Sequence, residues 1–91
     1  MIVCTLILRL ELDEVSSLKG RRSVINSLKE KLKTLNVSIL DISDAYPKEA
    51  TLALAFLSPD AKHSAQYRER IESLIESRFP QYPIDIDYEE F

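Results

Sequence analysis

Every second residue of the segment Ile2–Leu12 is apolar, and this pattern constrains the fold more than any other feature of the sequence. One set of alternate residues is wholly apolar: Ile2, Cys4, Leu6, Leu8, Leu10 and Leu12. A period of two predicts a β-strand. The intervening residues Val3 and Ile7 are apolar as well, so the first half of this strand has two apolar faces, as a central strand has. We therefore expect this strand to lie inside a sheet, with a neighbouring strand on each side.

A helical pattern follows over Ser17–Leu35. Ser17 can accept hydrogen bonds from the free backbone N–H groups at a helix start, and Asn36 is a suitable stop. One apolar stripe at helical spacing is expected to face the core. It consists of Leu18, Ile25, Leu28, Leu32 and Leu35, with Val24 at its edge.

The rest of the chain also contains segments with the two-residue period of a strand and one segment with helical spacing. A second strand is predicted over Val37–Ala45 and a third, apolar on both faces, over Ala50–Leu57. Ser58-Pro59-Asp60 predicts a helix start, with Ser58 as the cap and Pro59 at the first helical position. This helix is expected to end before Pro80, and alternating residues then predict a last strand. The residues expected to be buried in the second helix are Tyr67, Ile71, Leu74 and Ile75.

The order βαββαβ predicts an α+β fold, the ferredoxin-like sandwich. With right-handed crossovers, four antiparallel strands carry two helices on one face. The first and third strands are central in this arrangement, which agrees with their two apolar faces. Residues 1–91 are expected to form one domain.

Composition indicates the cellular compartment that the protein occupies. The single cysteine, Cys4, cannot form an internal disulfide, which is typical of a reducing cytosol. The first twelve residues lack the cationic start and the cleavage site of a signal peptide, and no apolar run is long enough to cross a membrane. We therefore expect a cytoplasmic protein that is not bound to a membrane.

The first helix holds the candidate binding surface. Between Lys19 and Lys33 there are six basic residues and one acid, which leaves six basic and fourteen acidic residues elsewhere. At about 100° per residue, five side chains form one line beside the apolar stripe. This basic stripe consists of Lys19, Arg22, Asn26, Lys29 and Lys33. It is a candidate contact line for an RNA backbone or an acidic protein. The alternative is a solvated face paired with Glu11, Asp13, Glu14 or Glu30.

Arg21 differs from its basic neighbours because its position falls within the apolar stripe. A cation there needs a partner or must reach the rim of the sheet. We expect a structural role for Arg21, with Glu11 or Asp13 as its partner.

Catalytic and metal-binding patterns are poorly represented. Cys4 and His63 are expected to be a core residue and a surface residue, not a nucleophilic pair or metal ligands. Asp85, Asp87 and Glu89 fall on one face at two-residue spacing and are interpreted as a solvated edge. We expect no catalytic residues, no cofactor and no metal, and hence a protein that is not an enzyme.

The sheet face away from the helices is predicted to be apolar. It would present Val3, Thr5, Ile7, Ala53, Ala55 and Leu57. It lacks the aromatic pairs that stack RNA bases on a sheet. An apolar face of this kind predicts burial against a second copy, as a homodimer; the alternative is a partly wetted face, which ferredoxin-like domains tolerate.

The run Ser17-Leu18-Lys19-Gly20-Arg21-Arg22-Ser23-Val24-Ile25-Asn26-Ser27-Leu28 resembles the Ser-Leu-Lys-x-Lys/Arg-Arg-x-Val-Leu-x-Ser-Leu signature of the YlxP-like family. These are small bacterial proteins of unknown function, also called domain of unknown function 503. The similarity extends over nearly the whole chain. Two departures are Gly20, in place of a charged residue, and Tyr46-Pro47, in place of a longer Trp-containing turn.

This resemblance implies a ferredoxin-like fold, frequent dimerisation and a gene neighbourhood rich in translation and ribosome-maturation factors. It supplies no catalytic residues. Two functions follow as hypotheses: a non-enzymatic protein that binds ribosomal RNA or the ribosome through the basic stripe, or a dimeric protein-interaction or regulatory module without a nucleic-acid role.

Overall fold

A computed structural model describes residues 1–91 and contains four strands and two α-helices in the order βαββαβ. The elements are β1 (Ile2–Glu11), α1 (Leu18–Leu32), a short 3-10 helix η1 (Lys33–Leu35), β2 (Ser38–Asp41), β3 (Glu49–Ser58), α2 (Ala61–Arg78) and β4 (Ile84–Glu90).

The four strands form one antiparallel sheet in the order β2-β3-β1-β4. The predicted ferredoxin-like topology is therefore confirmed, with β1 and β3 at the centre. Their pairing covers the full length of both strands, from Ile2 opposite Ser58 to Glu11 opposite Glu49. The long two-sided apolar segments thus pair with each other, as their composition requires.

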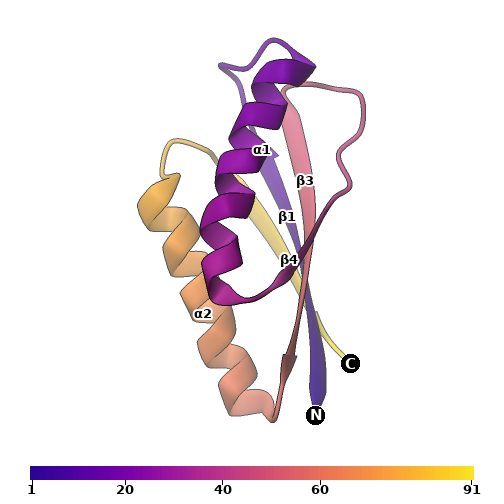
Figure 1. Ribbon diagram of the computed structural model, residues 1–91, viewed down its shortest axis with the longest axis vertical. Helices are drawn as coiled ribbons and strands as arrows, with labels where there is room; N and C mark the ends of the chain where they lie inside the picture. The colour runs from indigo at the N-terminus through magenta and orange to yellow at the C-terminus, as the bar shows by residue number, and fades with distance from the viewer.

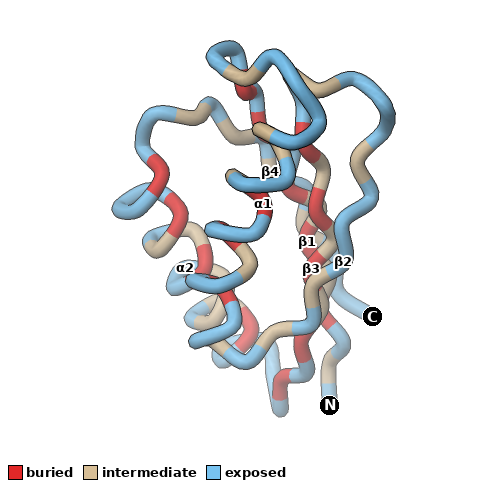
Figure 2. Tube along the Cα trace, turned by 45° about the horizontal axis from the view of Figure 1, so that its top comes forward, coloured by how far each residue is buried: buried red, intermediate tan, exposed pale blue.

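Both helices lie on the same face of the sheet, and the two termini meet at one end of it (Figure 1). Buried positions follow the inner side of the strands and the facing side of the helices (Figure 2). The helices and the sheet thus form two layers, and the other face of the sheet is open.

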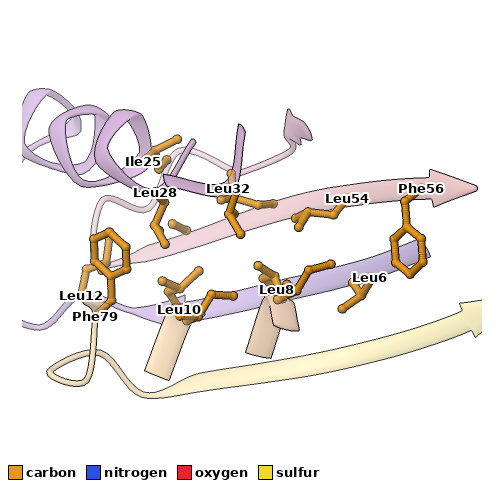
Figure 3. Close-up of a cluster of buried hydrophobic side chains, with 14 of the residues drawn as sticks. Leu6, Leu8, Leu10, Leu12, Ile25, Leu28, Leu32, Leu54, Phe56 and Phe79 are labelled. Carbon is orange, nitrogen blue, oxygen red and sulfur yellow. The ribbon is translucent and has the colours of Figure 1, made fainter. Parts of the chain in front are cut away.

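The core lies between these layers, where leucines of β1 and β3 meet the helix stripes (Figure 3). It contains Cys4, Leu6, Leu8, Leu10, Leu12, Ile25, Leu28, Leu32, Ala50, Leu52, Leu54, Phe56, Ile71, Ile75 and Phe79. Each fully buried Leu or Ile stabilises the fold by about 1.5–3 kcal/mol relative to an exposed one. This dry layer fixes which side of each helix faces solvent.

The second strand is shorter than predicted, because side-chain bonds replace regular backbone pairing beyond Asp41. Ile42 still donates to the carbonyl of Thr51 at 2.9 Å, but the backbone N–H of Thr51 donates to the side chain of Ser43 at 2.9 Å. Asp41 Oδ1 accepts from the backbone N–H of Ser43 at 2.9 Å, and Asp44 Oδ1 accepts from that of Tyr46 at 2.8 Å. Such Asp-centred turns compete with strand pairing. The strand predicted to reach Ala45 therefore ends at Asp41.

The start of α2 also differs from the prediction. The cap is Asp60, whose carboxylate accepts from the backbone N–H of His63 at 2.8 Å. Ser58 is instead the last residue of β3, and its buried hydroxyl donates to the carbonyl of Asp60 at 2.7 Å. Ser58 and Asp60 are both residue types that can cap a helix. Asp60, which lies outside the sheet, is the one that caps α2.

The interior faces of the helices agree with the predictions except at their margins. Leu18 begins α1 but is 49% exposed, because it lies in the first turn beyond the end of the core. Tyr67 and Leu74 of α2 are half-buried, whereas Ser64, which was not predicted, is fully buried. Phe79, just after α2, closes the core at that end.

Candidate functional site

The basic stripe occupies one side of α1 and continues into η1. Ser17 caps the helix as predicted, accepting from the backbone N–H of Gly20 at 3.1 Å. Asn36 ends η1 in the left-handed conformation, with φ of 57°. Between these ends Lys19, Arg22, Asn26 and Lys33 are exposed and Lys29 is half-buried. From Lys19 to Lys33 the stripe extends about 21 Å at the usual helical rise of 1.5 Å per residue.

No residue of the stripe takes part in an ion pair. The cations in the salt bridges of the molecule are Arg9 and Arg68, and the ring of His63 contacts Asp60. The four acids that could have neutralised the stripe, Glu11, Asp13, Glu14 and Glu30, are not among their partners. The four cations of the stripe therefore form no salt bridge.

Lys29 has one acidic neighbour, Asp41 at the end of β2. Burial raises the pKa of Asp41, but hydrogen bonds from Ser43 and the fields of Lys29 and Arg21 outweigh it and hold that pKa below its usual value. Lys29 therefore lies on the β2 side of the molecule, and the middle of the stripe adjoins this edge of the sheet.

The first turn of α1 opposes the usual charge preference of a helix. It contains no acid, although carboxylates stabilise the positive end of the helix dipole. Lys19, Arg21 and Arg22 occupy this region instead. An approaching anion would relieve the repulsion, since the free N–H groups of a helix start attract negative charge.

Arg21 has a structural role, as expected, but not with the expected partner. Its guanidinium donates to the backbone carbonyl of Tyr46 at 2.7 Å and to that of Glu49 at 3.2 Å. The prediction of an acid from the end of β1 was wrong, because the half-buried side chain meets the loop between β2 and β3 instead. This contact could not be predicted from the sequence, because every residue has a backbone carbonyl and no residue type marks the one that accepts.

Cys4 and His63 lie in the core and on the surface respectively, as predicted, and their side chains do not contact each other. Cys4 is fully buried, with its Sγ 3.3 Å from the hydroxyl of Ser64 and 3.5 Å from that of Tyr88. Burial raises the pKa of the Tyr88 phenol, which stays protonated and donates to Glu90 at 2.6 Å. His63 is on the surface, bonded to Asp60 at 2.8 Å. No cluster of three or more potential metal ligands exists in the structure.

The open face of the sheet carries large exposed apolar side chains. Val3 and Leu57, both predicted, are 37% and 64% exposed. Leu40 and Phe91, at 63% and 71%, were not predicted. Leu40 and Phe91 line a shallow hollow of about 390 Å³ whose floor includes Ile7 and Ala53. Register alone could have placed them here, since Leu40 pairs with Ala53, and Phe91 exchanges backbone hydrogen bonds with Val3.

The β4 edge of this face is acidic. Asp85, Asp87 and Glu89 point away from the helices and are exposed, as predicted for a solvated edge. Arg9 donates to Asp87 at 2.8 Å and lies 4.0 Å from Asp85. The hydrogen bond and the charge of Asp87 raise the pKa of Arg9. The apolar part of the open face therefore lies over β1, β2 and β3.

Neither helix combines the length and the apolar composition that a bilayer crossing requires.

Several solved structures share this fold at low sequence identity. A de novo designed protein, Foldit4, matches with a TM-score of 0.59 at 14% identity, over 98% of this chain and 97% of the other. A protein of unknown function from Nitrosomonas europaea matches with a TM-score of 0.57 at 16% identity, over 100% and 90%. A dimeric ferredoxin-like protein from an uncultured marine organism matches with a TM-score of 0.51 at 11% identity, over 98% and 92%. These similarities support the fold.

Sequence comparison gives the family. No functionally curated protein matches the chain. Residues 3–88 match the family described as "Protein of unknown function (DUF503)", which agrees with the resemblance that the Ser17–Leu28 signature indicated. The match extends over nearly the whole chain, and the protein therefore belongs to the DUF503 family.

Proposed function

We propose that the protein is a non-enzymatic binding protein that contacts the RNA backbone, in ribosomal RNA or on the ribosome, through the basic stripe of α1. The observation that supports this most is the absence of any ion pair along Lys19, Arg22, Lys29 and Lys33. Four cations without salt bridges, spread over about 21 Å, can contact several phosphates of one backbone.

Part of the stripe is unfavourable for its own helix, although Lys29, in the last turn, interacts favourably with the helix dipole. Lys29 and Lys33 are like charges at (i, i+4), and such pairs destabilise a helix by about 0.2–0.5 kcal/mol. The cations of the first turn oppose the helix dipole as well. Sites that break several local rules together are typical of functional surfaces. A polyanion would turn both repulsions into attraction.

The overall charge favours a directed contact. The chain has a net charge of −3, so that non-specific attraction to nucleic acid is weak outside α1. RNA would therefore approach with α1 first, since the rest of the surface repels it.

A filter-binding titration of ribosomal RNA fragments tests this proposal. The variant Lys29→Glu/Lys33→Glu should lose most of its affinity, because two attractive contacts become repulsive. A matched control is Lys31→Glu, which changes an exposed residue on the other flank of the same helix. Equal affinities of the wild type and the double variant would exclude the stripe as the RNA-binding surface.

A second candidate function is a dimeric protein-interaction or regulatory module without a nucleic-acid role. The open sheet face supports it, because Leu40, Leu57 and Phe91 are each more than 60% exposed. Exposed apolar patches of this kind mark association sites. The dimeric ferredoxin-like protein of similar fold adds a precedent for assembly of this architecture. In this hypothesis the open face joins two copies and α1 binds an acidic protein.

Sedimentation equilibrium tests the dimer. Leu57→Lys should shift the protein towards the monomer if the open face joins two copies, whereas Leu18→Lys, an exposed leucine on the helix side, should not. A pull-down that survives nuclease treatment would favour the protein partner over RNA. An unchanged mass of Leu57→Lys over a range of concentrations, equal to the dimer mass, would place the interface elsewhere.

A further inference from the structure

The outer edge of β4 combines free backbone groups with a hollow beside them. Phe91 and Val3 exchange backbone hydrogen bonds, and Glu11 donates to the carbonyl of Pro83. Because backbone groups alternate in direction along a strand, the N–H and C=O groups of Ile84, Ile86 and Tyr88 point away from β1. β4 is an edge strand, so these groups face no neighbouring strand.

The hollow lies between β4 and the end of α2 and has a volume of about 290 Å³. Ile84 and Ile86 line it from the strand, and Ile75, Phe79 and Tyr82 complete an apolar floor. Phe79 and Tyr82 stack at 6.5 Å between ring centroids, which fixes its closed end. The depression is large enough for one apolar side chain and lies directly beside the free strand edge.

Carboxylates surround this edge on both faces of the sheet. Glu72 and Glu76 of α2 border the hollow, and Asp85 and Asp87 lie on the opposite face. Glu76 has no ion pair, and Glu72 lies 4.0 Å from Arg68. On the other face Arg9 pairs with Asp87 at 2.8 Å and lies 4.0 Å from Asp85, so this cation offsets part of the charge there. Arg68 is placed over the Tyr88 ring, 4.4 Å from its centroid. Among these four carboxylates, the one without a cation partner is therefore Glu76, which borders the hollow together with Ile84 and Ile86.

We propose that the β4 edge binds an extended, basic segment of another protein, which adds a strand to the sheet. Backbone hydrogen bonds to Ile84, Ile86 and Tyr88 would supply affinity, as in other strand-addition complexes. One apolar side chain of the segment fills the hollow. Its Lys or Arg residues face Glu72 and Glu76 on one side and Asp85 and Asp87 on the other.

Charge decides between this partner and a second copy of the chain. Two β4 edges repel each other through their acids, which is a common protection against self-pairing. The other free edge, β2, is only four residues long and contains Asp41 but no cation. The same acids that oppose self-association attract a basic segment, and this surface is separate from the basic stripe of α1.

A labelled peptide tests the proposal. The probe is a fluorescein-labelled, acetylated heptapeptide of lysine with one central valine, which presents lysines on both faces of the added strand. It is titrated by fluorescence anisotropy. We expect saturable binding, no binding of the peptide with glutamate in place of lysine, and none of the peptide N-methylated on alternate amides, which keeps its charge but loses its backbone donors. Failure of the lysine peptide to bind, or equal binding of the N-methylated form, would overturn strand addition.

Variants and hydrogen exchange locate the contact. Glu72→Lys/Glu76→Lys should weaken binding roughly ten-fold, as expected for two exposed ion pairs made repulsive. Glu69→Lys is the matched control, since Glu69 is an exposed acid on another side of α2. The amide protons of Ile84, Ile86 and Tyr88 should exchange more slowly with the peptide bound. Unchanged exchange at all three, or equal weakening by Glu69→Lys, would disprove the assignment to β4.

Discussion

The guanidinium of Arg21 donates to the backbone carbonyl of Tyr46 at 2.7 Å, and this bond joins α1 to the loop between β2 and β3. A second bond, to the carbonyl of Glu49 at 3.2 Å, reaches the first residue of β3. One cation in an otherwise apolar stripe thus fixes the position of α1 relative to the β2 side of the sheet. The basic stripe occupies the neighbouring side of the same helix, whose orientation is set by the core and reinforced by this contact.

Arg21→Ala is expected to lower the free energy of unfolding by about 1–2 kcal/mol, because two charge-assisted hydrogen bonds and the packing of the aliphatic stem are lost. Arg21→Leu should keep the fold and lose less, since leucine restores apolar packing while the two carbonyl groups turn to water. Urea denaturation of both variants measures the difference. A melt of Arg21→Ala that coincides with the wild type would contradict a structural role.

The strands and helices could be predicted because local and global signals agree. The two-sided apolarity of β1 and β3 has one solution, a central place in the sheet, and the order βαββαβ then leaves a single common topology. Errors occurred where several weak local signals compete. Asp41 and Asp44 end β2 early through their own turns, and Asp60 replaces Ser58 as the cap. Which residue ends a strand or caps a helix depends on how far the pairing of the sheet extends along the chain.

The candidate site was predictable in position but not in its surroundings. Helical periodicity places Lys19, Arg22, Asn26, Lys29 and Lys33 on one line, as the structure does. The sequence left open whether nearby acids neutralise them, because this depends on distances between α1 and the loops. Phe91 and Leu40 were not predicted to lie on the open face. Their position there follows from strand register, which periodicity within one segment does not reveal.

The cap of α2 should make stability depend on pH. The backbone N–H of His63, and then its side chain, hold the pKa of Asp60 below the usual value. A carboxylate with a lowered folded-state pKa stabilises the fold above its unfolded-state pKa of about 3.9, and this contribution disappears as the pH falls through the folded-state value. Thermal melts of Asp60→Asn should therefore show a lower Tm than the wild type near neutral pH and little difference in strong acid.

The control for this measurement is Glu69→Gln, which removes one exposed negative charge of α2 without changing its cap. Its Tm should follow that of the wild type at every pH. If Asp60→Asn stays below the wild type by the same amount in strong acid, the cap acts through geometry alone and not through its charge.

Gly20 should tolerate alanine with a small gain in stability. It lies in the first turn of α1, where alanine favours the helix by about 1 kcal/mol relative to glycine. A Cβ at this position would lie 3.3 Å from Cγ1 of Val15 and 3.4 Å from Oγ of the cap Ser17. Val15 must therefore shift slightly, and the measured gain should be less than the full amount. In a Val15→Ala background, the same change should give more, and an equal gain in both backgrounds would exclude this contact as the cause.

The salt dependence of RNA binding gives the most direct count of the cations in the stripe. If Lys19, Arg22, Lys29 and Lys33 each neutralise one phosphate of a single strand, the logarithm of the association constant should fall with the logarithm of salt concentration with a slope of about −2.8. Affinity would then drop roughly 50-fold between about 50 and 200 mM salt. Each change of a stripe lysine to glutamine should make the slope shallower by about 0.7, because one fewer phosphate releases its counterions. Lys31→Gln should leave the slope unchanged. A slope that is insensitive to Lys29→Gln and Lys33→Gln would show that RNA binds to another surface.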